Sequence, residues 1–209
     1  MYDRIRQRGF PLDDNCVLWM PFYRYGAEMS RIWDYGFDNV SGAYTTALPV
    51  DFGWYFDGAA ARVEHASTLL SKTHTMHYWI QRDGAGAGVL HGGADEYVVQ
   101  VTDTTVGYSS AAGGIVAVTH NGAASTAKKT LISVQRIVDK ILFFQDGVQI
   151  GTEQTLPVVD NMTVTDIGRQ TTPGDYFEGI IYEAVVFGDA QGAVKIRNFF
   201  EMTRRIQGI

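Results

Sequence analysis

The chain has 209 residues, of which 45% are hydrophobic, 12% aromatic and 19% charged, and its formal net charge is −6. This length is enough to bury one sizeable core, while the negative charge argues against nucleic acid as the main partner. No apolar run approaches the roughly 18 residues of a membrane-spanning helix, so membrane insertion is not expected. The many aromatic residues and the 23 glycines favour short strands joined by tight turns.

The first 15 residues are polar and are expected to form an N-terminal arm, followed by one domain over residues 16–209. Val17 to Phe22 is predicted to be the first core strand. The single cysteine, Cys16, precedes it and is expected to be a buried, inert thiol. A chain with one cysteine has no internal disulfide, which suits folding in a reducing cytosol. Tyr23 to Thr46 is predicted to be mostly loop.

Strong strand patterns begin in the middle of the chain. Thr75 to Gln81 alternates so that Met76, Tyr78 and Ile80 share one face, and the residues between them share the other. Both faces carry apolar residues, so we expect this strand to be covered on both sides. Asp83 to Gly93 contains five glycines and is predicted to be a flexible connection.

About a dozen short strands with regularly spaced turns indicate a single antiparallel β-sandwich. Further strands are predicted at Phe52–Phe56, Glu96–Val101, Thr105–Ser109, Gly114–His120, Thr130–Arg136, Lys140–Gln145, Gly147–Gly151, Val164–Gly168 and Gly179–Phe187. The core is predicted to include Trp19, Phe56, Trp79, Ile141, Phe143, Ile180 and Val186.

One amphipathic helix is predicted from about Ala190 to Arg205. Asp189 is expected to cap its first amide groups. Its buried face is a set of four residues at helical spacing. These residues are Ile196, Phe199, Phe200 and Thr203.

The order of several short motifs resembles that of the laminin-G-like, concanavalin A-like jelly rolls. Leu18-Trp19-Met20-Pro21-Phe22 is similar to the apolar opening strand of that family. Phe56-Asp57-Gly58 is similar to its turn, and Asp146-Gly147 to its late hairpin. The resemblance covers Val17 to Phe200 and implies a jelly-roll sandwich, a fold used mostly for binding or assembly.

The resemblance also implies a place for calcium, although this chain departs from the pattern there. Alanines 59–61 stand where some relatives carry paired acids. Asp34 and Asp57 remain as candidate calcium ligands, but calcium needs six to eight oxygens. A turn-forming role is favoured for both aspartates, because Asp in such loops commonly accepts hydrogen bonds from local amides.

Catalysis is not expected from the sequence. Retaining glucanases of this fold need carboxylates on one strand face, about 5 Å apart, and no acid–x–acid–x–acid run exists here. His74 and His77 are three residues apart in a predicted strand, so they should face opposite ways and cannot share a metal ion. His65, His91 and His120 are predicted to be isolated. These patterns predict a protein that is not an enzyme.

Four aromatic residues near loops are candidates for stacking on a sugar, although such rings more often fill the rim of a core. They are Trp33, Tyr35, Tyr44 and Trp54. Five arginines near the two ends are candidates for assembly, with solvated ends as the simpler alternative. They are Arg4, Arg6, Arg8, Arg204 and Arg205.

Together these features lead to one main functional hypothesis and two alternatives. The main hypothesis is a structural or adhesive component of a virion surface, such as a capsid decoration or tail protein. It would be made in host cytoplasm and would dock on a protein shell or form homo-oligomers. The first alternative is a lectin-like carbohydrate-binding module, exported by a non-classical route. The second, disfavoured for lack of paired acids, is a glycoside hydrolase.

Overall fold

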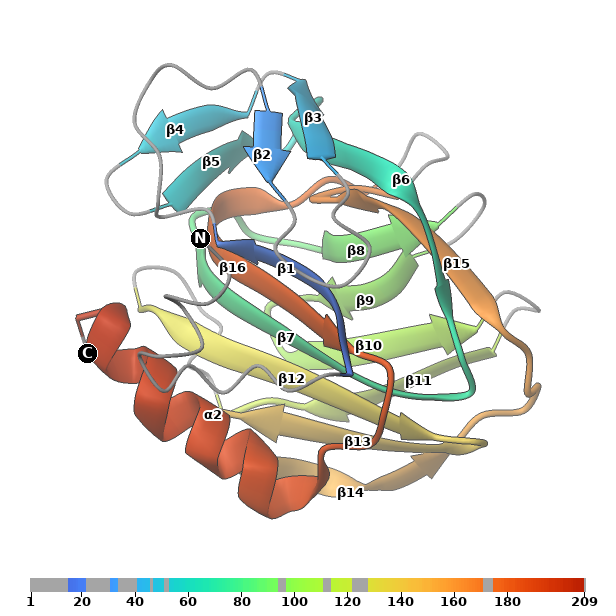
Figure 1. Ribbon diagram of the computed structural model, residues 1–209. Coiled ribbons are helices and arrows are strands. Elements are labelled where there is room, and N and C mark those ends of the chain that lie inside the picture. The colour runs from blue at the N-terminus through green and yellow to red at the C-terminus, as the bar shows by residue number, and fades with distance from the viewer. Residues whose placement is uncertain are drawn as a thin grey trace.

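The computed structural model describes residues 15–21, 31–33, 41–45, 47–50, 53–93, 97–110, 114–121, 128–170 and 175–208. These residues form two antiparallel β-sheets of eight strands each, with one helix on the outer face of one sheet (Figure 1). The structure therefore confirms the all-β sandwich with a C-terminal helix that the sequence predicts.

The first sheet is built around its two longest strands, β7 (Thr73–Arg82) and β16 (Glu178–Phe187). Beyond β7 lie β12 (Thr130–Ile137), β13 (Lys140–Gln145) and β14 (Val148–Thr155). On the other edge of β16, β5 (Gly53–Asp57) and β1 (Cys16–Pro21) follow one another, because β5 pairs with residues 178–181 and β1 with residues 183–187. The short strand β4 (Leu48–Val50) pairs with β5.

The second sheet runs in the order β11, β10, β9, β8, β15, β6, β3 and β2. Its strands are β11 (Gly114–Thr119), β10 (Thr105–Ser110), β9 (Tyr97–Val101), β8 (Gly88–Gly93), β15 (Met162–Ile167), β6 (Arg62–Leu70), β3 (Ser41–Thr45) and β2 (Arg31–Trp33). β9 and β10 pair as an antiparallel hairpin, and Asp103 lies in the turn between them.

The main core fills the space between the sheets. In β7, Met76, Tyr78 and Ile80 belong to this inner cluster, while Trp79 belongs to a second cluster on the outer face, so both faces are covered as predicted. Of the seven predicted core residues, all except Ile180 are at most 1% exposed, and Ile180 is half-buried. Cys16 is buried, as expected.

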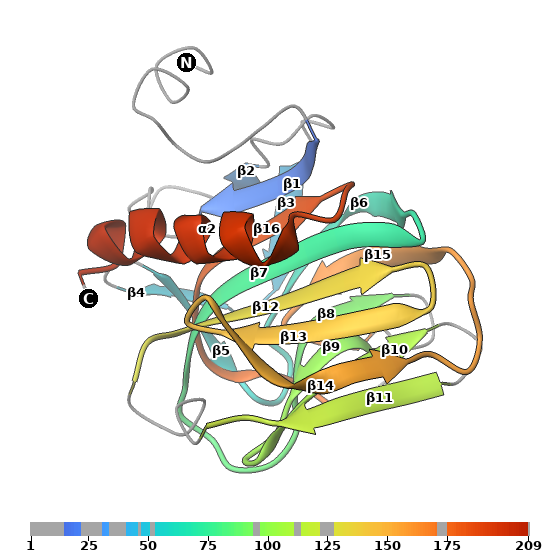
Figure 2. The same ribbon diagram turned by 90° about the horizontal axis from the view of Figure 1, so that it is seen from below.

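The outer face of the first sheet is covered by helix α2 (Gly192–Ile206), which lies across it in Figure 2. The ring of Phe199 stacks on His77 of β7, with centroids 4.3 Å apart, and Phe200 stacks on Trp79 at 5.7 Å. The indole N–H of Trp79 also donates to the Thr203 hydroxyl, at 2.8 Å. The predicted apolar face of the helix is thus the face that binds the sheet.

The predicted capping of this helix is wrong. The N-cap residue is Gln191, and it makes no side-chain capping bond. The amide of Gly192 donates instead to the side chain of Gln135 on β12, at 2.6 Å. Asp189 accepts hydrogen bonds from Gln191 and Asn15. A residue distant in sequence therefore satisfies the orphan amide, which local capping rules do not anticipate.

Two segments expected to be irregular contain strands. The glycine-rich stretch predicted to be flexible includes β8, where Gly92 and Gly93 lie so close to the backbone carbonyls of Arg169 and Thr163 that a side chain would collide with them. Within Tyr23 to Thr46, predicted to be mostly loop, β2 and β3 form an edge of the second sheet. The glycines of β8 therefore mark close backbone packing rather than flexibility.

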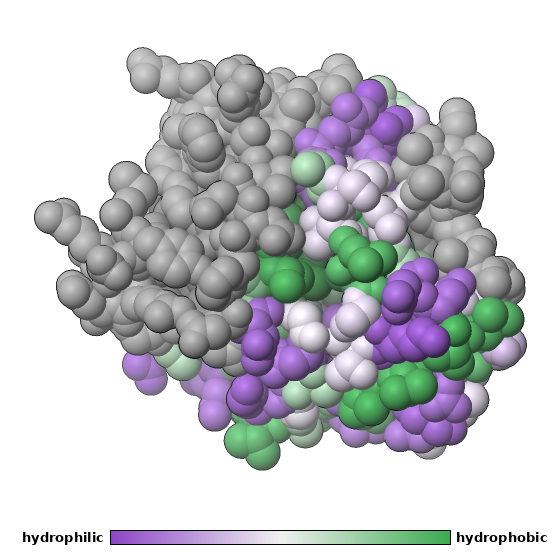
Figure 3. Space-filling model, turned by 45° about the vertical axis from the view of Figure 1, so that its right-hand side comes forward, coloured by the Kyte–Doolittle hydropathy of each residue, from purple (hydrophilic) through white to green (hydrophobic). Residues whose placement is uncertain are grey.

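The described surface carries scattered apolar residues. The most exposed are Val194, Leu69 and Ile115, at 75%, 66% and 60%. In the face shown in Figure 3, apolar groups lie between hydrophilic ones. Single exposed apolar residues are normal on soluble proteins and need no functional explanation. The polar rim of the sandwich is the more informative place to look for a site.

Phe143 tests the core. It is 1% exposed and packs between the sheets. Phe143→Ala should lower the free energy of unfolding by about 3–5 kcal/mol, because it removes a buried ring and leaves a cavity. Urea denaturation measures the change. Val194→Ala, on the exposed side of α2, serves as the control and should change stability by no more than about 0.5 kcal/mol. Equal effects of the two substitutions would contradict the burial of Phe143.

Candidate functional site: a polar pocket at the rim

Loops at one end of the sandwich enclose a pocket of about 120 Å³. It is lined by the turn after β5, by the end of β7 and the loop that follows, and by the residues that lead into β16. The lining residues are Gly58, Arg82, Gly84, Ala85, Ala87, Gly88, Asp175, Tyr176 and Glu178. We refer to this site as the rim pocket. Four of these residues have polar side chains, namely Arg82, Asp175, Tyr176 and Glu178. The other five are glycines and alanines, whose polar groups are those of the backbone.

The turn that forms one wall is organised by Asp57. Its Oδ1 accepts hydrogen bonds from the amides of residues 59, 60 and 61, at 3.0, 2.9 and 2.8 Å. Partial burial alone would raise the pKa of Asp57, but the amides of Ala60, Ala61 and Ala59 outweigh burial and lower that pKa below its ordinary value. Asp57 therefore performs the turn-forming role favoured by the sequence.

Glu178 stands at the start of β16 and is cradled by glycines. A Cβ at Gly84 would collide with the Glu178 carboxylate, and a Cβ at Gly58 would lie 3.0 Å from Glu178 Cβ. The backbones are tied as well, because Asp83 donates its amide to the Glu178 carbonyl at 3.1 Å. Two glycines thus leave the room that the Glu178 side chain occupies beside the pocket.

Arg82 forms the floor, with only 3% of its side chain exposed. Its guanidinium donates to the carbonyls of Thr102 and Gly86, at 2.6 and 2.5 Å, and to Asp103 at 3.2 Å. These bonds connect the loop after β7 to the turn between β9 and β10. Arg82 therefore holds two loops in place, and its charge is offset by Asp103.

The remaining wall comes from the segment before β16. Asp175 accepts a hydrogen bond from the Gln100 side chain of β9, at 3.0 Å, and Tyr176 forms a β-bridge with Arg169. Gln100 thereby fixes one carboxylate oxygen of Asp175. Asp175, Tyr176 and Glu178 all line the same pocket.

The charged side chains that line the pocket are two acids, Asp175 and Glu178, and one base, Arg82. The pKa of Tyr55, on β5, is raised first by desolvation and then by the charges of Glu178, Asp83 and Asp57. Only the smaller part of this shift comes from nearby negative charge, because desolvation is its main cause. The pocket accordingly favours neutral or positively charged ligands over anions.

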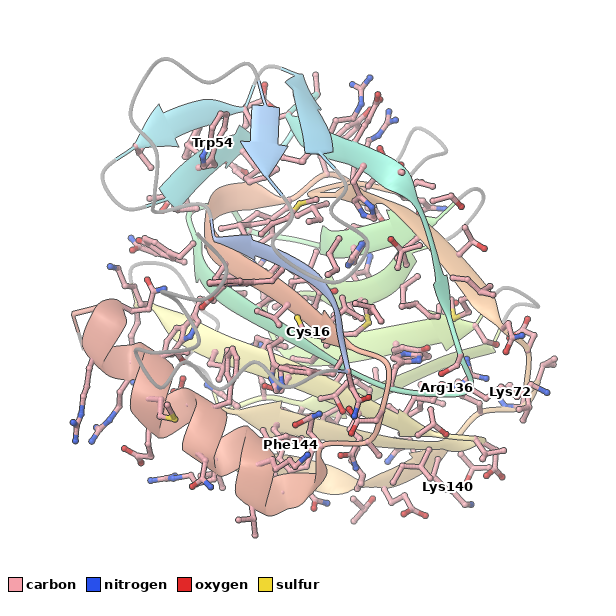
Figure 4. The ribbon with its side chains drawn as sticks, viewed as in Figure 1. Cys16, Trp54, Lys72, Arg136, Lys140 and Phe144 are labelled. Carbon is pink, nitrogen blue, oxygen red and sulfur yellow. The ribbon has the colours of Figure 1, made fainter. Side chains whose placement is uncertain are left out.

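The predicted sugar-stacking residues do not form this site. Trp54 is only 3% exposed and belongs to the core, so its ring is not open to a ligand; Figure 4 shows it on β5. Trp33 and Tyr44 lie in β2 and β3, but their side chains are outside the part that the structure describes, as is all of Tyr35. Trp54 thus fills the core, which was the alternative to sugar stacking for these rings.

The calcium expectation is only partly covered by the structure. Asp34 lies outside the described residues. Asp57 uses one carboxylate oxygen for its turn. Among the described residues, no group of three or more His, Cys, Asp or Glu side chains is arranged to hold a metal ion.

The predicted assembly arginines divide in the same way. Arg4, Arg6 and Arg8 are outside the described residues. Arg204 pairs with Glu201 at 2.7 Å, and its guanidinium lies 5.8 Å from the centre of the Phe200 ring. Arg205 is exposed on the same helix.

No described helix is long and apolar enough to cross a membrane.

The histidines confirm one expectation and correct another. His74 bonds to Tyr108 in the interior, while His77 stacks on the outer helix, so the two face opposite sides as predicted. His65 and His91, predicted to be isolated, lie with their Nε2 atoms 3.0 Å apart. Sequence spacing of 26 residues gave no sign of this pairing.

Sequence reasoning also missed the rim pocket. Arg82, Asp175 and Tyr176 were not candidates, because each is an ordinary residue in its local sequence. The available signal was the run of glycines after Arg82, which marks a loop held against other backbone.

No protein-family model matches the sequence, and no curated protein sequence is significantly similar to it. The fold is similar to solved structures. Trypanosoma rangeli sialidase matches with a TM-score of 0.69 and 14% identity, over 93% of this chain and 34% of the sialidase chain. The complex of that sialidase with sialic acid matches with a TM-score of 0.63 and 13% identity, over 93% and 34%. A protein named HCR/D matches with a TM-score of 0.67 and 8% identity, over 91% and 52%.

This chain therefore spans about a third of the sialidase and about half of HCR/D. At such low identity the likeness establishes the fold alone. It nevertheless corrects the expectation that the protein is not an enzyme, because a sialidase shares this architecture over 93% of the chain. That expectation relied on one glucanase arrangement, with acids on a single strand, and the absence of this arrangement does not exclude catalysis.

Asp57 gives a direct test of the two roles weighed for it. Asp57→Ala should destabilise the protein by about 1 kcal/mol, since three amides lose their common acceptor. The loss should be the same with calcium and with chelator, as measured by thermal denaturation. Asp139→Ala, in the turn between β12 and β13, is the comparison substitution. A calcium-dependent loss for Asp57→Ala alone would instead indicate a metal ligand.

Proposed function

We propose that the protein is a carbohydrate-binding β-sandwich of the concanavalin A-like type, with the rim pocket as its site. The observation that carries the proposal is the pocket itself, where two carboxylates, a tyrosine and glycine-rich backbone converge. Carboxylate oxygens and backbone amides and carbonyls are suitable partners for sugar hydroxyls, and an aromatic ring can stack on the apolar face of a sugar.

The size of the pocket limits what it can hold. At about 120 Å³ it is smaller than the roughly 300–1,000 Å³ of pockets that enclose whole drug-sized ligands. It suits one part of a sugar ring, with the rest of a glycan lying outside. The lining carries the carboxylates of Asp175 and Glu178 against one arginine that is already paired with Asp103, which favours neutral or amino sugars over acidic ones. This ligand class differs from the sialic acid that the sialidase complex contains.

Glu178→Gln tests the site. The substitution keeps the size of the side chain, which must fit beside Gly84, but removes its charge. A glycan array on the folded protein first identifies a neutral or amino-sugar ligand, and titration calorimetry then measures its affinity. The variant should bind roughly 10- to 100-fold more weakly, as expected for loss of a charged hydrogen-bond acceptor.

Glu153→Gln on β14 is the matched control, because Glu153 is exposed and remote from the pocket lining. It should leave the affinity unchanged. The proposal fails if the folded protein binds no glycan on the array, or if Glu178→Gln and Glu153→Gln bind equally well. Release of reducing sugar during the titration would reveal turnover at the same site.

The virion-surface role remains a second proposal, supported by the charge of helix α2. Its exposed part carries Arg205 beside the Arg197–Glu201–Arg204 group, where two arginines share one carboxylate. This excess of positive charge suits an acidic protein shell or an acidic patch on another copy of the chain.

The assembly role is tested by sedimentation of the protein with Arg205→Glu and, separately, without residues 1–11. Either change should reduce self-association or particle binding, and more strongly at low salt, because exposed charges are screened as salt increases. Lys72→Glu, between β6 and β7 and away from α2 in Figure 4, should have no effect. Identical sedimentation of all forms would contradict the role of both ends.

A further inference from the structure

The largely apolar interior of the sandwich contains two chains of hydrogen-bonded side chains that cross from one sheet to the other. In the first, His65 of β6 contacts His91 of β8 through their Nε2 atoms at 3.0 Å, and His91 Nδ1 contacts the Tyr78 hydroxyl of β7 at 2.6 Å. Tyr78 and His91 are fully buried, and His65 is 7% exposed. We call this the His65 chain.

The second chain, the His74 chain, runs beside it. Arg136 of β12 contacts the Tyr108 hydroxyl of β10 at 3.4 Å, and this hydroxyl contacts His74 Nε2 of β7 at 3.0 Å. All three side chains are fully buried. Figure 4 places Arg136 at the end of the sandwich near Lys72. Both chains therefore tie the second sheet to the same strand, β7.

The contacts fix the position of every proton in the His65 chain. His65 Nδ1 is 2.8 Å from the carbonyl of Ala66, which can only accept, so this nitrogen carries the hydrogen. In the neutral ring, His65 Nε2 is then an acceptor, and His91 Nε2 must donate to it. His91 Nδ1 is thereby an acceptor and takes the Tyr78 proton. The chain has one hydrogen for each link.

The same reasoning applies to the His74 chain. His74 Nδ1 is 2.7 Å from the carbonyl of Ser71 and donates to it, so His74 Nε2 accepts the Tyr108 proton. The Tyr108 oxygen accepts in turn from Arg136. Arg136 also donates to the carbonyl of Val138, at 2.9 Å. One further proton in the His65 chain would leave a donor facing a donor. In the His74 chain it would turn the Tyr108 hydroxyl hydrogen away from His74 and toward the Met162 sulfur, 3.3 Å away.

The surroundings oppose protonation of these rings. Burial, opposed by the Ser71 carbonyl and assisted by the Arg136 charge, lowers the pKa of His74 to about 4. Burial also holds the pKa of His91 well below its ordinary value, with help from His65 and His74. Burial lowers the pKa of His65, although the Ala66 carbonyl and the Asp166 carboxylate act in the opposite direction.

The other charged and titratable groups that act on the two chains do not restore the ordinary pKa of the histidines. Asp166 of β15, buried like the chains, is paired with Arg169 at 2.9 Å. Asp160, before β15, acts on Tyr108, whose pKa burial raises to about 12. Tyr78 is likewise held in its neutral form by burial and by Tyr108. Both tyrosines thus remain donors throughout the pH range in which histidine titrates.

We propose that the His65 and His74 chains form an acid-sensitive lock that joins the two sheets at neutral pH and releases β8 and β10 from β7 in acid. A proton taken up by the His65 chain breaks at least one of its hydrogen bonds, and one taken up by the His74 chain reverses the bond between His74 and Tyr108. Either proton also places a charge in the largely apolar interior. The lock is independent of any ligand in the rim pocket.

The sign of the pH dependence follows from the neutral native rings. Unfolded histidines bind protons below about pH 6.5, whereas the native rings bind them only at lower pH, about 4 for His74. Stability is therefore complete above about pH 6.5 and is lost as the pH falls toward about 4. Each such histidine increases the unfolding equilibrium constant roughly tenfold per pH unit within this window.

The first test is the double substitution His65→Gln with His74→Gln. In both places the glutamine oxygen can take over the acceptor role of Nε2 without titrating. Urea denaturation between pH 6.5 and 5 measures the unfolding equilibrium constant. Each pH unit of acidification should increase this constant by a factor about 100-fold smaller in the double variant than in the unsubstituted protein, because two histidines no longer titrate. Val134→Ala, a core substitution on β12, is the matched control and should lower stability equally at every pH.

The second test uses the unsubstituted protein, so it stands even if the variant fails to fold. Nitrogen-15 NMR at pH 7.5 should show hydrogen on Nδ1 of His65 and His74 and on Nε2 of His91. Hydrogen exchange at pH 5 should show lost protection of β8 and β10 before the β13–β14 hairpin. An unchanged pH dependence in the folded double variant, other tautomers, or histidines that titrate near pH 6.5 with protection intact would overturn the proposal.

Discussion

The burial of β7 on both faces is the constraint on which the rest of the structure depends. Its inner side chains meet the second sheet, and its outer side chains meet helix α2. A strand covered twice has to place a suitable residue at every position. His77 and Trp79 fill the outer face against Phe199 and Phe200, while His74 and Tyr78 supply the polar contacts inside. The sandwich and its helix thus meet at β7, and the neighbouring strands β12 and β16 add further contacts to the helix.

The strand pattern was predictable where a residue's neighbours in sequence decide its environment. Alternation placed Met76 and Trp79 on the correct faces, and helical spacing found the buried face of α2. Prediction failed where a residue distant in sequence decides. Gln135 caps the helix in place of Asp189, and the Arg169 carbonyl turns a glycine in β8 into a packing requirement. Neither contact leaves a trace in the local sequence.

The rim pocket was beyond prediction for the same reason. Its walls come from the turn after β5, the loop after β7 and the segment before β16, which are adjacent only because β16 pairs with both other strands. Asp57 was found because its role is local, a turn stabilised by the next few amides. Glu178 acquires its position from Gly58 and Gly84, far away in the chain. A role that depends on neighbouring residues can be predicted from a single sequence. A role that depends on residues brought together by folding requires the structure.

The place of β16 also affects how the molecule is made. Residues 178–187 lie between β7 on one side and β5 and β1 on the other. These three strands precede β16 by about a hundred residues or more, so they are synthesised long before the strand with which they pair. During translation the first sheet stays open until the ribosome has released that segment. The exposed strand edges of the nascent chain are available for wrong pairing meanwhile. A stop codon or a stalled ribosome before residue 178 would leave the two halves of this sheet unjoined.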